Sequence, residues 1–152
     1  MSEKTDIFLE LHVPDFQRAI DFYKILGFEV VWVSNEYLVM KRGDSALFFY
    51  GGDDRVYSHS YFGQFVKNTK RGYGVEIILY EKNIKEFYER IKDKVKVAQK
   101  LELKHWGAWD FRIEDPFGYY IRIGEPQTIL NDRKMVAKTK EAVKQRGLKG
   151  LS

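Results

Sequence analysis

The sequence predicts an α+β fold in which a strand, a helix and three further strands occur in that order twice. Strand-like runs are rich in β-branched and aromatic residues, and an amphipathic helical segment follows the first run of each half. A polar, glycine-containing stretch at 51–73 separates the halves. We therefore expect two βαβββ modules, at about 6–50 and 74–126, in one domain over 1–126 whose paired sheets form a half-barrel cleft. A basic helical tail, 127–152, follows the domain.

In the first half, residues 7–13 alternate as a strand. Pro14 and Asp15 then supply a stop and an N-cap for a helix that begins at Phe16. Gly27 is the expected C′ residue after this helix. The apolar stripe of the helix consists of Phe16, Ala19, Ile20 and Tyr23.

Three apolar runs complete the first half, and polar or glycine-containing breaks separate them. They predict strands over 28–33, 37–42 and 45–50. In the second half, residues 74–80 predict a strand, and Asn83 and Glu86 have the spacing of a capping box for a helix that ends near residue 92. The later strands are expected at 95–100, 109–114 and 119–124.

The last strand follows a tight turn at 115–118, Asp-Pro-Phe-Gly, whose proline fixes φ and whose glycine permits a positive φ. Side chains alternate beyond this turn. Ile121 and Ile123 point to one face of the sheet, and Tyr120 and Arg122 point to the other. Arg122 therefore determines the chemistry of the second face.

Composition narrows the cellular setting and the available chemistry. The absence of cysteine removes disulfides, thiolate ligands and cysteine nucleophiles, and it suits a reducing compartment. The N-terminus is polar and acidic, and no apolar run approaches the length of a membrane span. We expect a cytoplasmic protein that makes no membrane contact.

The net charge of +4 is concentrated in the tail. Residues 127–152 carry seven Lys and Arg against two Asp and Glu, a net charge of +5, whereas residues 1–126 carry 19 against 20, a net charge of −1. A basic tail can bind nucleic acid, but this one has no aromatic residue to stack on bases. A solvated surface helix from Asn131 or Asp132 to about Gln145 is the favoured interpretation, with Gly147 ending it.

Several short motifs occur in a familiar order: LHVPD at 11–15, AIDFY at 19–23, LGF at 26–28, RGD at 42–44, WG at 106–107 and DPFG at 115–118. Their order resembles the glyoxalase/bleomycin resistance/dioxygenase superfamily, also called vicinal oxygen chelate. The resemblance covers about residues 6–126 and implies the half-barrel fold. It does not select a function, because the superfamily holds isomerases, lyases, dioxygenases and drug-binding proteins.

Metal-using members of this superfamily place His or Glu ligands on strands from both modules. Counting from the motifs, the resemblance assigns these positions to Phe8, Phe48, Glu76 and Arg122. Only Glu76 could coordinate a metal, whereas catalytic sites need about three protein ligands. We expect no metal and no other cofactor. A shifted metal site of Glu10, His12 and Glu76 is the alternative.

Glu76 and Arg122 suggest a different design, in which they form a bidentate ion pair where relatives hold the metal. The pair could simply brace two strands. Alternatively, Arg122 receives an anionic or carbonyl oxygen of a ligand while Glu76 orients that ligand or binds its amine. Neither interpretation provides a nucleophile or a proton shuttle, so no catalytic residue is assigned.

The remaining candidate ligand-binding residues are mostly aromatic and suit a flat molecule. With Glu76 and Arg122, the expected cleft comprises Phe8, Glu10, His12, Phe48, Tyr50, Tyr80 and Tyr120, with Trp32, Trp106 and Trp109 at its rim.

The pattern is closest to the bleomycin-resistance branch, which implies a homodimer with clefts shared between protomers. The leading hypothesis is a metal-free binding protein, rather than an enzyme, that sequesters a planar molecule such as a bleomycin-like antibiotic and thereby confers antibiotic resistance. Two features depart from this branch, since the domain is nearly neutral and Arg122 would repel a cationic drug. The alternative is a metal-dependent lyase, isomerase or dioxygenase with the shifted site. Nucleic-acid binding through the tail is a third hypothesis.

Overall fold

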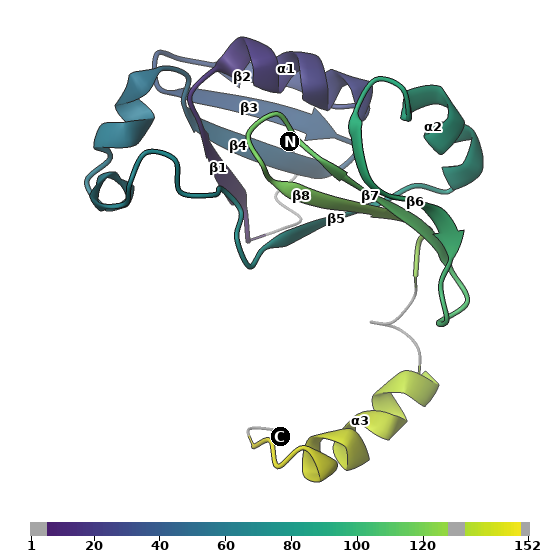
Figure 1. Cartoon of the computed structure of the whole chain (residues 1–152). Coiled ribbons are helices and arrows are strands. Elements are labelled where there is room, and N and C mark those ends of the chain that lie inside the picture. The colour runs from purple at the N-terminus through teal and green to yellow at the C-terminus, as the bar shows by residue number, and fades with distance from the viewer. Residues whose placement is uncertain (1–5, 128–132, 150–152) are drawn as a thin grey trace.

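The computed structural model describes residues 6–127 and 133–149, and these residues form two four-stranded sheets with the same strand order (Figure 1). Sheet A runs β1 (Leu9–Val13), β4 (Ser45–Gly51), β3 (Tyr37–Arg42), β2 (Glu29–Val33). Sheet B runs β5 (Glu76–Tyr80), β8 (Tyr120–Gly124), β7 (Trp109–Glu114), β6 (Lys96–Leu103). In each sheet the first and last strands of the module pair in parallel, and the other pairs are antiparallel.

A helix follows the first strand of each module, α1 (Phe16–Ile25) in the first and α2 (Ile84–Ile91) in the second. Two short 3-10 helices, η1 (Asp54–Ser58) and η2 (Phe62–Gln64), lie between the modules. Helix α3 (Arg133–Gln145) follows the second module and lies apart from the sheets in Figure 1. The predicted α+β fold of two βαβββ modules with a C-terminal basic helix is confirmed.

The helix boundaries follow local sequence signals, with one exception. The Asp15 carboxylate accepts a hydrogen bond from the Arg18 backbone N–H at 3.0 Å, so it caps α1 as predicted. Gly27 has a φ of +94°, as a C′ glycine should. The predicted capping box of α2 is wrong, because the Asn83 side chain makes no capping bond. Instead, the Glu81 carboxylate accepts from the Asn83 backbone N–H at 3.3 Å.

The turn before β8 forms as its sequence predicts. Gly118 has a φ of +102° and its N–H donates to the Asp115 carbonyl at 3.2 Å. The Asp115 side chain accepts from the backbone N–H groups of Phe117 at 2.9 Å and Tyr119 at 2.8 Å. The turn therefore fixes the register of β8, and Ile121 is buried on its inner face.

One core joins the two modules, because the helix-facing sides of both sheets contribute to the same cluster of buried side chains. The sheet residues in this cluster include Leu11, Val13, Leu38, Met40, Phe49, Phe111, Ile113, Ile121 and Ile123. From the helices, Phe22 is buried in it although the predicted stripe of α1 left it out. Helix α1 contacts β2 and β3, and α2 contacts β7.

Two groups of polar contacts between the modules lie at the ends of the strands. The Tyr119 hydroxyl bonds both the backbone N–H and the carbonyl of His12, at 3.1 and 2.9 Å. At the other end, the Arg42 guanidinium donates to the Tyr80 carbonyl at 3.0 Å and to the Glu81 carboxylate at 2.5 Å. These bonds satisfy backbone groups at strand ends that neither sheet pairs.

The C-terminal helix ends where the sequence predicts. Gly147 has a φ of +67°, and the backbone N–H of Leu148 reaches back to the Val143 carbonyl at 2.9 Å. The two proposed capping residues, Asn131 and Asp132, lie outside the described residues. Within the described ranges, the helices are all too short or too polar to cross a bilayer.

Candidate functional site

The face of each sheet that lies opposite the core is called here its open face. On sheet A, strand register places Glu10 beside Phe48 and Phe48 beside Val39 on this face. An irregularity in β2 between Val30 and Trp32 turns Trp32 to the same face, opposite Val39. The predicted alternation thus gathers most of the expected residues of the first module: Phe8, Glu10, His12, Trp32, Phe48 and Tyr50.

Aromatic rings dominate the open face of sheet A. The rings of Phe8 and Phe48 lie 5.1 Å apart between centroids, and those of Tyr37 and Tyr50 lie 5.5 Å apart. Such tilted pairs are favourable beyond the area they bury. The side chain of Trp32 remains 54% exposed beside them. This face therefore offers an apolar surface that a flat molecule can contact.

His12 lies at the edge of this face, and its imidazole ring contacts three other rings. Its ring centroid is 4.8 Å from those of Tyr50 and His59 and 4.9 Å from that of Phe62. Its Nε2 lies 3.2 Å from a Glu10 carboxylate oxygen. Burial lowers the pKa of His12, although the hydrogen bond and charge of Glu10 oppose this shift. His12 is therefore predominantly neutral at physiological pH.

Glu76 contacts two arginines on the open face of sheet B. The Arg112 Nε donates to a Glu76 oxygen at 3.1 Å, and the Arg122 Nε lies 3.6 Å from the same oxygen. The Glu76–Arg122 ion pair is thus present, but it is not bidentate. Arg112 takes the nearer position because register places it directly beside Arg122 on the neighbouring strand.

Arg112 also connects Glu76 to further polar groups of sheet B. Its Nη1 donates to Gln99 at 2.6 Å and to Asp110 at 3.1 Å. Asp110 is only 2% exposed, and the Lys104 ammonium lies 3.7 Å from its carboxylate. Sequence reasoning missed this network, although alternation along 109–114 would have placed Asp110 and Arg112 on the face of Arg122.

Two buried atoms of this network lack hydrogen-bond partners among the described residues. They are an Asp110 carboxylate oxygen, Oδ2, and the Arg122 Nε. One is an acceptor and the other a donor, and each is costly to bury unpaired. The open face of sheet B therefore carries one buried acceptor and one buried donor that the described residues leave unpaired.

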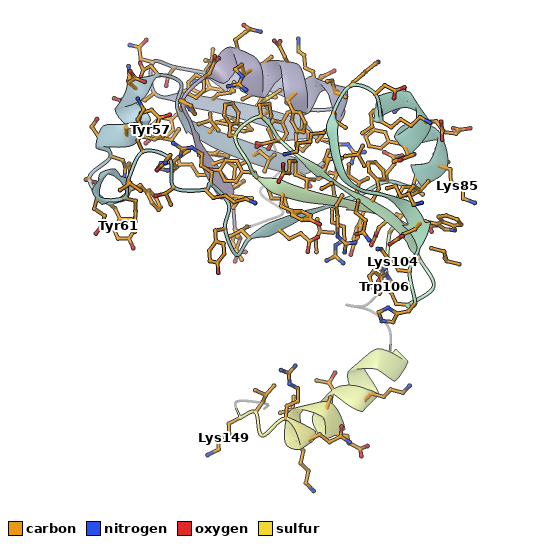
Figure 2. The ribbon with its side chains drawn as sticks, viewed as in Figure 1. Tyr57, Tyr61, Lys85, Lys104, Trp106 and Lys149 are labelled. Atoms are coloured by element: carbon orange, nitrogen blue, oxygen red, sulfur yellow. The ribbon has the colours of Figure 1, made fainter. Side chains whose placement is uncertain are left out.

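The two remaining predicted tryptophans lie elsewhere. Trp109 packs partly buried against the core on the helix side of β7, and the Lys85 ammonium of α2 lies 4.3 Å from its ring centroid. Its expected place at a cleft rim is therefore wrong, because Trp109 shares the alternation of the buried Phe111. Trp106 lies in the exposed turn between β6 and β7, at the opposite end of the domain from Tyr57 (Figure 2). The other two candidates, Tyr80 and Tyr120, lie on the open face of sheet B.

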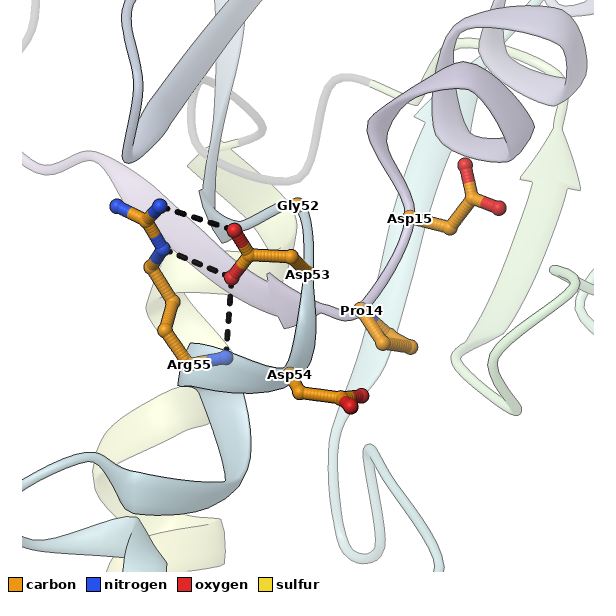
Figure 3. Close-up of a pocket in the computed structure, with 6 residues that line it drawn as sticks. All are labelled: Pro14, Asp15, Gly52, Asp53, Asp54 and Arg55. Atoms are coloured by element: carbon orange, nitrogen blue, oxygen red, sulfur yellow. Dashed lines mark hydrogen bonds and ion pairs between the residues drawn. The ribbon is translucent and has the colours of Figure 1, made fainter.

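A surface hollow of about 820 Å³ lies between the start of α1 and η1 (Figure 3). Two of its three acidic side chains, those of Asp15 and Asp53, have partners within the chain. Asp15 caps α1, and Asp53 accepts from the Arg55 Nε at 2.8 Å, from its Nη2 at 2.9 Å and from its backbone N–H at 3.0 Å. These contacts lower the pKa of Asp53. We assign this hollow a structural role in joining β4 to the following segment.

Comparison of the sequence with models of protein families gives a match that includes strands of both sheets and the 115–118 turn. The model of the Glyoxalase/Bleomycin resistance protein/Dioxygenase superfamily matches residues 7–123. The chain belongs to this superfamily. The resemblance noted in the sequence is thereby confirmed for family and fold.

Solved structures of the superfamily share the fold at low identity. A bleomycin resistance determinant encoded on the transposon Tn5 aligns with a TM-score of 0.60 and 21% identity, over 82% of this chain and 100% of that one. A bleomycin-binding protein complexed with bleomycin gives a TM-score of 0.56 and 21% identity at the same coverage. A superfamily enzyme from Burkholderia phytofirmans gives 0.65 and 14%, over 78% of this chain and 95% of that one. No curated protein sequence matches.

The four positions to which the resemblance assigns metal ligands hold residues that together do not fit a metal ion. Phe8 and Phe48 have no ligating atom, and Arg122 carries a fixed positive charge beside Glu76. Among the described residues, no three His, Asp or Glu side chains are grouped so that they could hold a metal. The three residues of the shifted site are not grouped among the described residues, because Glu10 and His12 contact each other on sheet A, whereas Glu76 pairs with the arginines of sheet B.

Proposed function

We propose that this protein binds a planar small molecule on its open faces without chemically altering it, and that it needs no metal to do so. The arrangement of Phe8, Phe48, Glu76 and Arg122 supports this proposal most directly. Two of these positions present aromatic rings, and the other two form an ion pair that can contact a ligand's polar atoms. A bleomycin-like antibiotic is one candidate ligand, and sequestration, with resistance as its consequence, is the corresponding role.

A homodimer forms part of the proposal. The open faces leave large apolar side chains in water, with Trp32 54% and Ile78 50% exposed. Exposed large apolar side chains, where they adjoin one another, mark an interaction surface. A second copy that covers both faces would convert two open surfaces into two shared clefts. Measuring molar mass in solution by light scattering tests this part, and a monomer at micromolar concentration would contradict it.

Ligand binding can be measured through tryptophan fluorescence, because Trp32 lies on the proposed surface. We expect quenching to saturate on titration with planar aromatic compounds, and chelator treatment to leave the affinity unchanged. Elemental analysis of the purified protein provides an independent test. A divalent metal near one equivalent per chain, held by open-face residues, would overturn the proposal.

The sign of the ligand's charge tests the roles of Arg122 and Glu76. Arg122→Met should weaken a planar anion by about tenfold, because one charge-assisted hydrogen bond is lost. Glu76→Gln should weaken a planar cation to a similar extent. The exposed Lys82→Gln, which removes one charge away from this surface, is the matched control and should change neither affinity. Equal effects of all three variants would count against a specific role for the pair.

A further inference from the structure

A cavity of about 380 Å³ lies beside the free edge of β1, between that strand and residues 56–75. Its volume falls within the range of small-molecule sites. The sequence predicted an irregular connection at 51–73 and assigned it no site. In the structure this connection, extended to Val75, supplies most of the cavity wall.

The wall next to β1 is held in place by contacts within the chain. Gly72 adopts a φ of +75° and packs so closely on Tyr119 that an added Cβ would lie 2.8 Å from the Tyr119 Cδ1. The Arg71 Nη1 donates to the His12 carbonyl at 3.1 Å, the same oxygen that the Tyr119 hydroxyl bonds. These contacts form the cavity before any ligand enters it, which reduces the entropy that binding would cost.

Positive charge predominates around this cavity. Lys67, Lys70 and Arg71 line it, and the Lys70 ammonium lies 3.8 Å from a Glu114 carboxylate oxygen, whereas the one acidic lining residue, Glu10, contacts His12 at 3.2 Å. The Lys67 ammonium and the Arg71 guanidinium lie 4.6 and 5.5 Å from the ring centroid of Tyr57. On the open face of sheet B, Arg112 is by contrast paired with both Glu76 and Asp110.

Apolar side chains line the rest of the cavity. Phe62, Phe65 and Val66 come from the 56–75 segment, and each is exposed to solvent. The rings of Phe62 and Phe65 lie 6.5 Å apart between centroids. An aromatic body can lie against these side chains while an acidic group of the same molecule approaches Lys67 and Arg71.

We propose that this cavity is a second ligand site, which shares Glu10 and His12 with the open face of sheet A but is not lined by Glu76 or Arg122, and that it binds a small organic anion with an aromatic body. The anionic group, a carboxylate, sulfonate or phosphate, lies near Lys67 and Arg71. The aromatic body lies against Phe62 and Phe65. This proposal does not depend on what the open faces bind.

A matched pair of fluorescent probes tests the charge requirement. Anilinonaphthalene sulfonate and the uncharged phenylnaphthylamine carry the same rings and differ in the sulfonate. We expect saturable binding of the sulfonate at one site per chain in the cavity, and much weaker binding of the uncharged probe. Lys67→Gln should weaken the sulfonate about tenfold and leave the uncharged probe unaffected.

Arg71→Gln should weaken the sulfonate at least as much, but Arg71 also holds the His12 carbonyl, so its loss could unfold the cavity wall. The Lys67→Gln variant avoids this problem, because the Lys67 ammonium contacts the Tyr57 ring and does not hold the backbone of the cavity wall. Lys82→Gln, which removes an exposed charge from a residue that does not line the cavity, is the control and should leave the affinity for the sulfonate unchanged.

The location of the bound probe can be tested with single thiols, because the chain contains no cysteine. Val66→Cys places a thiol at the cavity, where the side chain is 72% exposed, and Val33→Cys places one on β2, where it is 57% exposed. Bound sulfonate should slow alkylation at position 66 but not at position 33. Protection at position 33 alone, or a sulfonate affinity unchanged by Lys67→Gln, would overturn the proposal.

Discussion

The Tyr23 hydroxyl of α1 donates a 2.8 Å hydrogen bond to the Asp115 carboxylate in the turn before β8. The same carboxylate accepts two backbone N–H groups of that turn, from Phe117 and Tyr119. One buried acid therefore joins the helix of the first module to the turn that sets the register of the second. Burial raises the pKa of Asp115, and its hydrogen bonds partly offset this shift.

Removing the Tyr23 hydroxyl should destabilise the fold. Tyr23→Phe keeps the ring in the core but leaves one buried carboxylate oxygen without its donor, so we expect a loss of about 1–3 kcal/mol in the free energy of unfolding. Urea denaturation measures this loss. Tyr61→Phe removes a hydroxyl from an exposed residue and should change stability by less than about 0.5 kcal/mol. Equal effects of the two variants would show that the bond between the modules contributes little.

The same pair predicts how stability depends on pH at the alkaline end. Burial and the neighbouring Asp115 raise the pKa of Tyr23 well above its ordinary value of 10.0. Above about pH 10, an unfolded chain releases this proton while the folded chain retains it, so the folded state binds more protons and its stability falls as pH rises. Tyr23→Phe removes this contribution, and its stability should approach that of the wild type as pH increases. Parallel curves of unfolding free energy against pH would contradict this explanation.

Gly72 tests how the wall of the cavity at β1 is formed. Gly72→Ala adds a methyl group against Tyr119 and forces a positive φ on a residue with a Cβ. Gly74→Ala also forces a positive φ on an alanine, but it causes no steric clash, because no atom lies within 4 Å of the added Cβ. We expect Gly74→Ala to cost about 1–2 kcal/mol and Gly72→Ala about 1–3 kcal/mol more. Thermal or urea unfolding of both variants measures the difference, which would vanish if the segment could move away from Tyr119.

Deleting residues 127–152 tests the proposed division between domain and tail. We expect the midpoint of urea unfolding to remain unchanged, because in the described part of the chain the strands and the core residues all lie before residue 127. Any binding to nucleic acid in the full chain should fall steeply with salt and disappear in the truncated one. Salt-dependent binding that survives the deletion would instead place a nucleic-acid surface on the domain.

Local signals in the sequence predicted much of the fold. The Asp15 cap, the positive φ of Gly118 and the alternation that buries Ile121 while Arg122 faces away are properties of a few consecutive residues. Such features depend on steric limits and on hydrogen bonds to neighbouring backbone, so they can be predicted without knowing which strands lie side by side. The order of the two modules followed from the same local patterns.

The contacts of Glu76 could not be predicted in the same way. Alternation placed Glu76 and Arg122 on one face, but the nearer partner proved to be Arg112, whose position depends on how β7 pairs with β8. The cavity beside β1 is likewise a product of how residues 56–75 return to Tyr119.

The sequence by itself thus determined the elements and their faces, and it placed Phe8, Phe48 and Arg122 at positions where the resemblance leads us to expect metal ligands. Only the tertiary structure decided which charges pair and where a cavity remains. The physical reason is the sequence separation of the interacting groups. A strand's two faces follow from the geometry of its own backbone, whereas ion pairs and cavities require groups distant in the chain to meet. Tyr23 and Asp115, 92 residues apart, show this limit most directly.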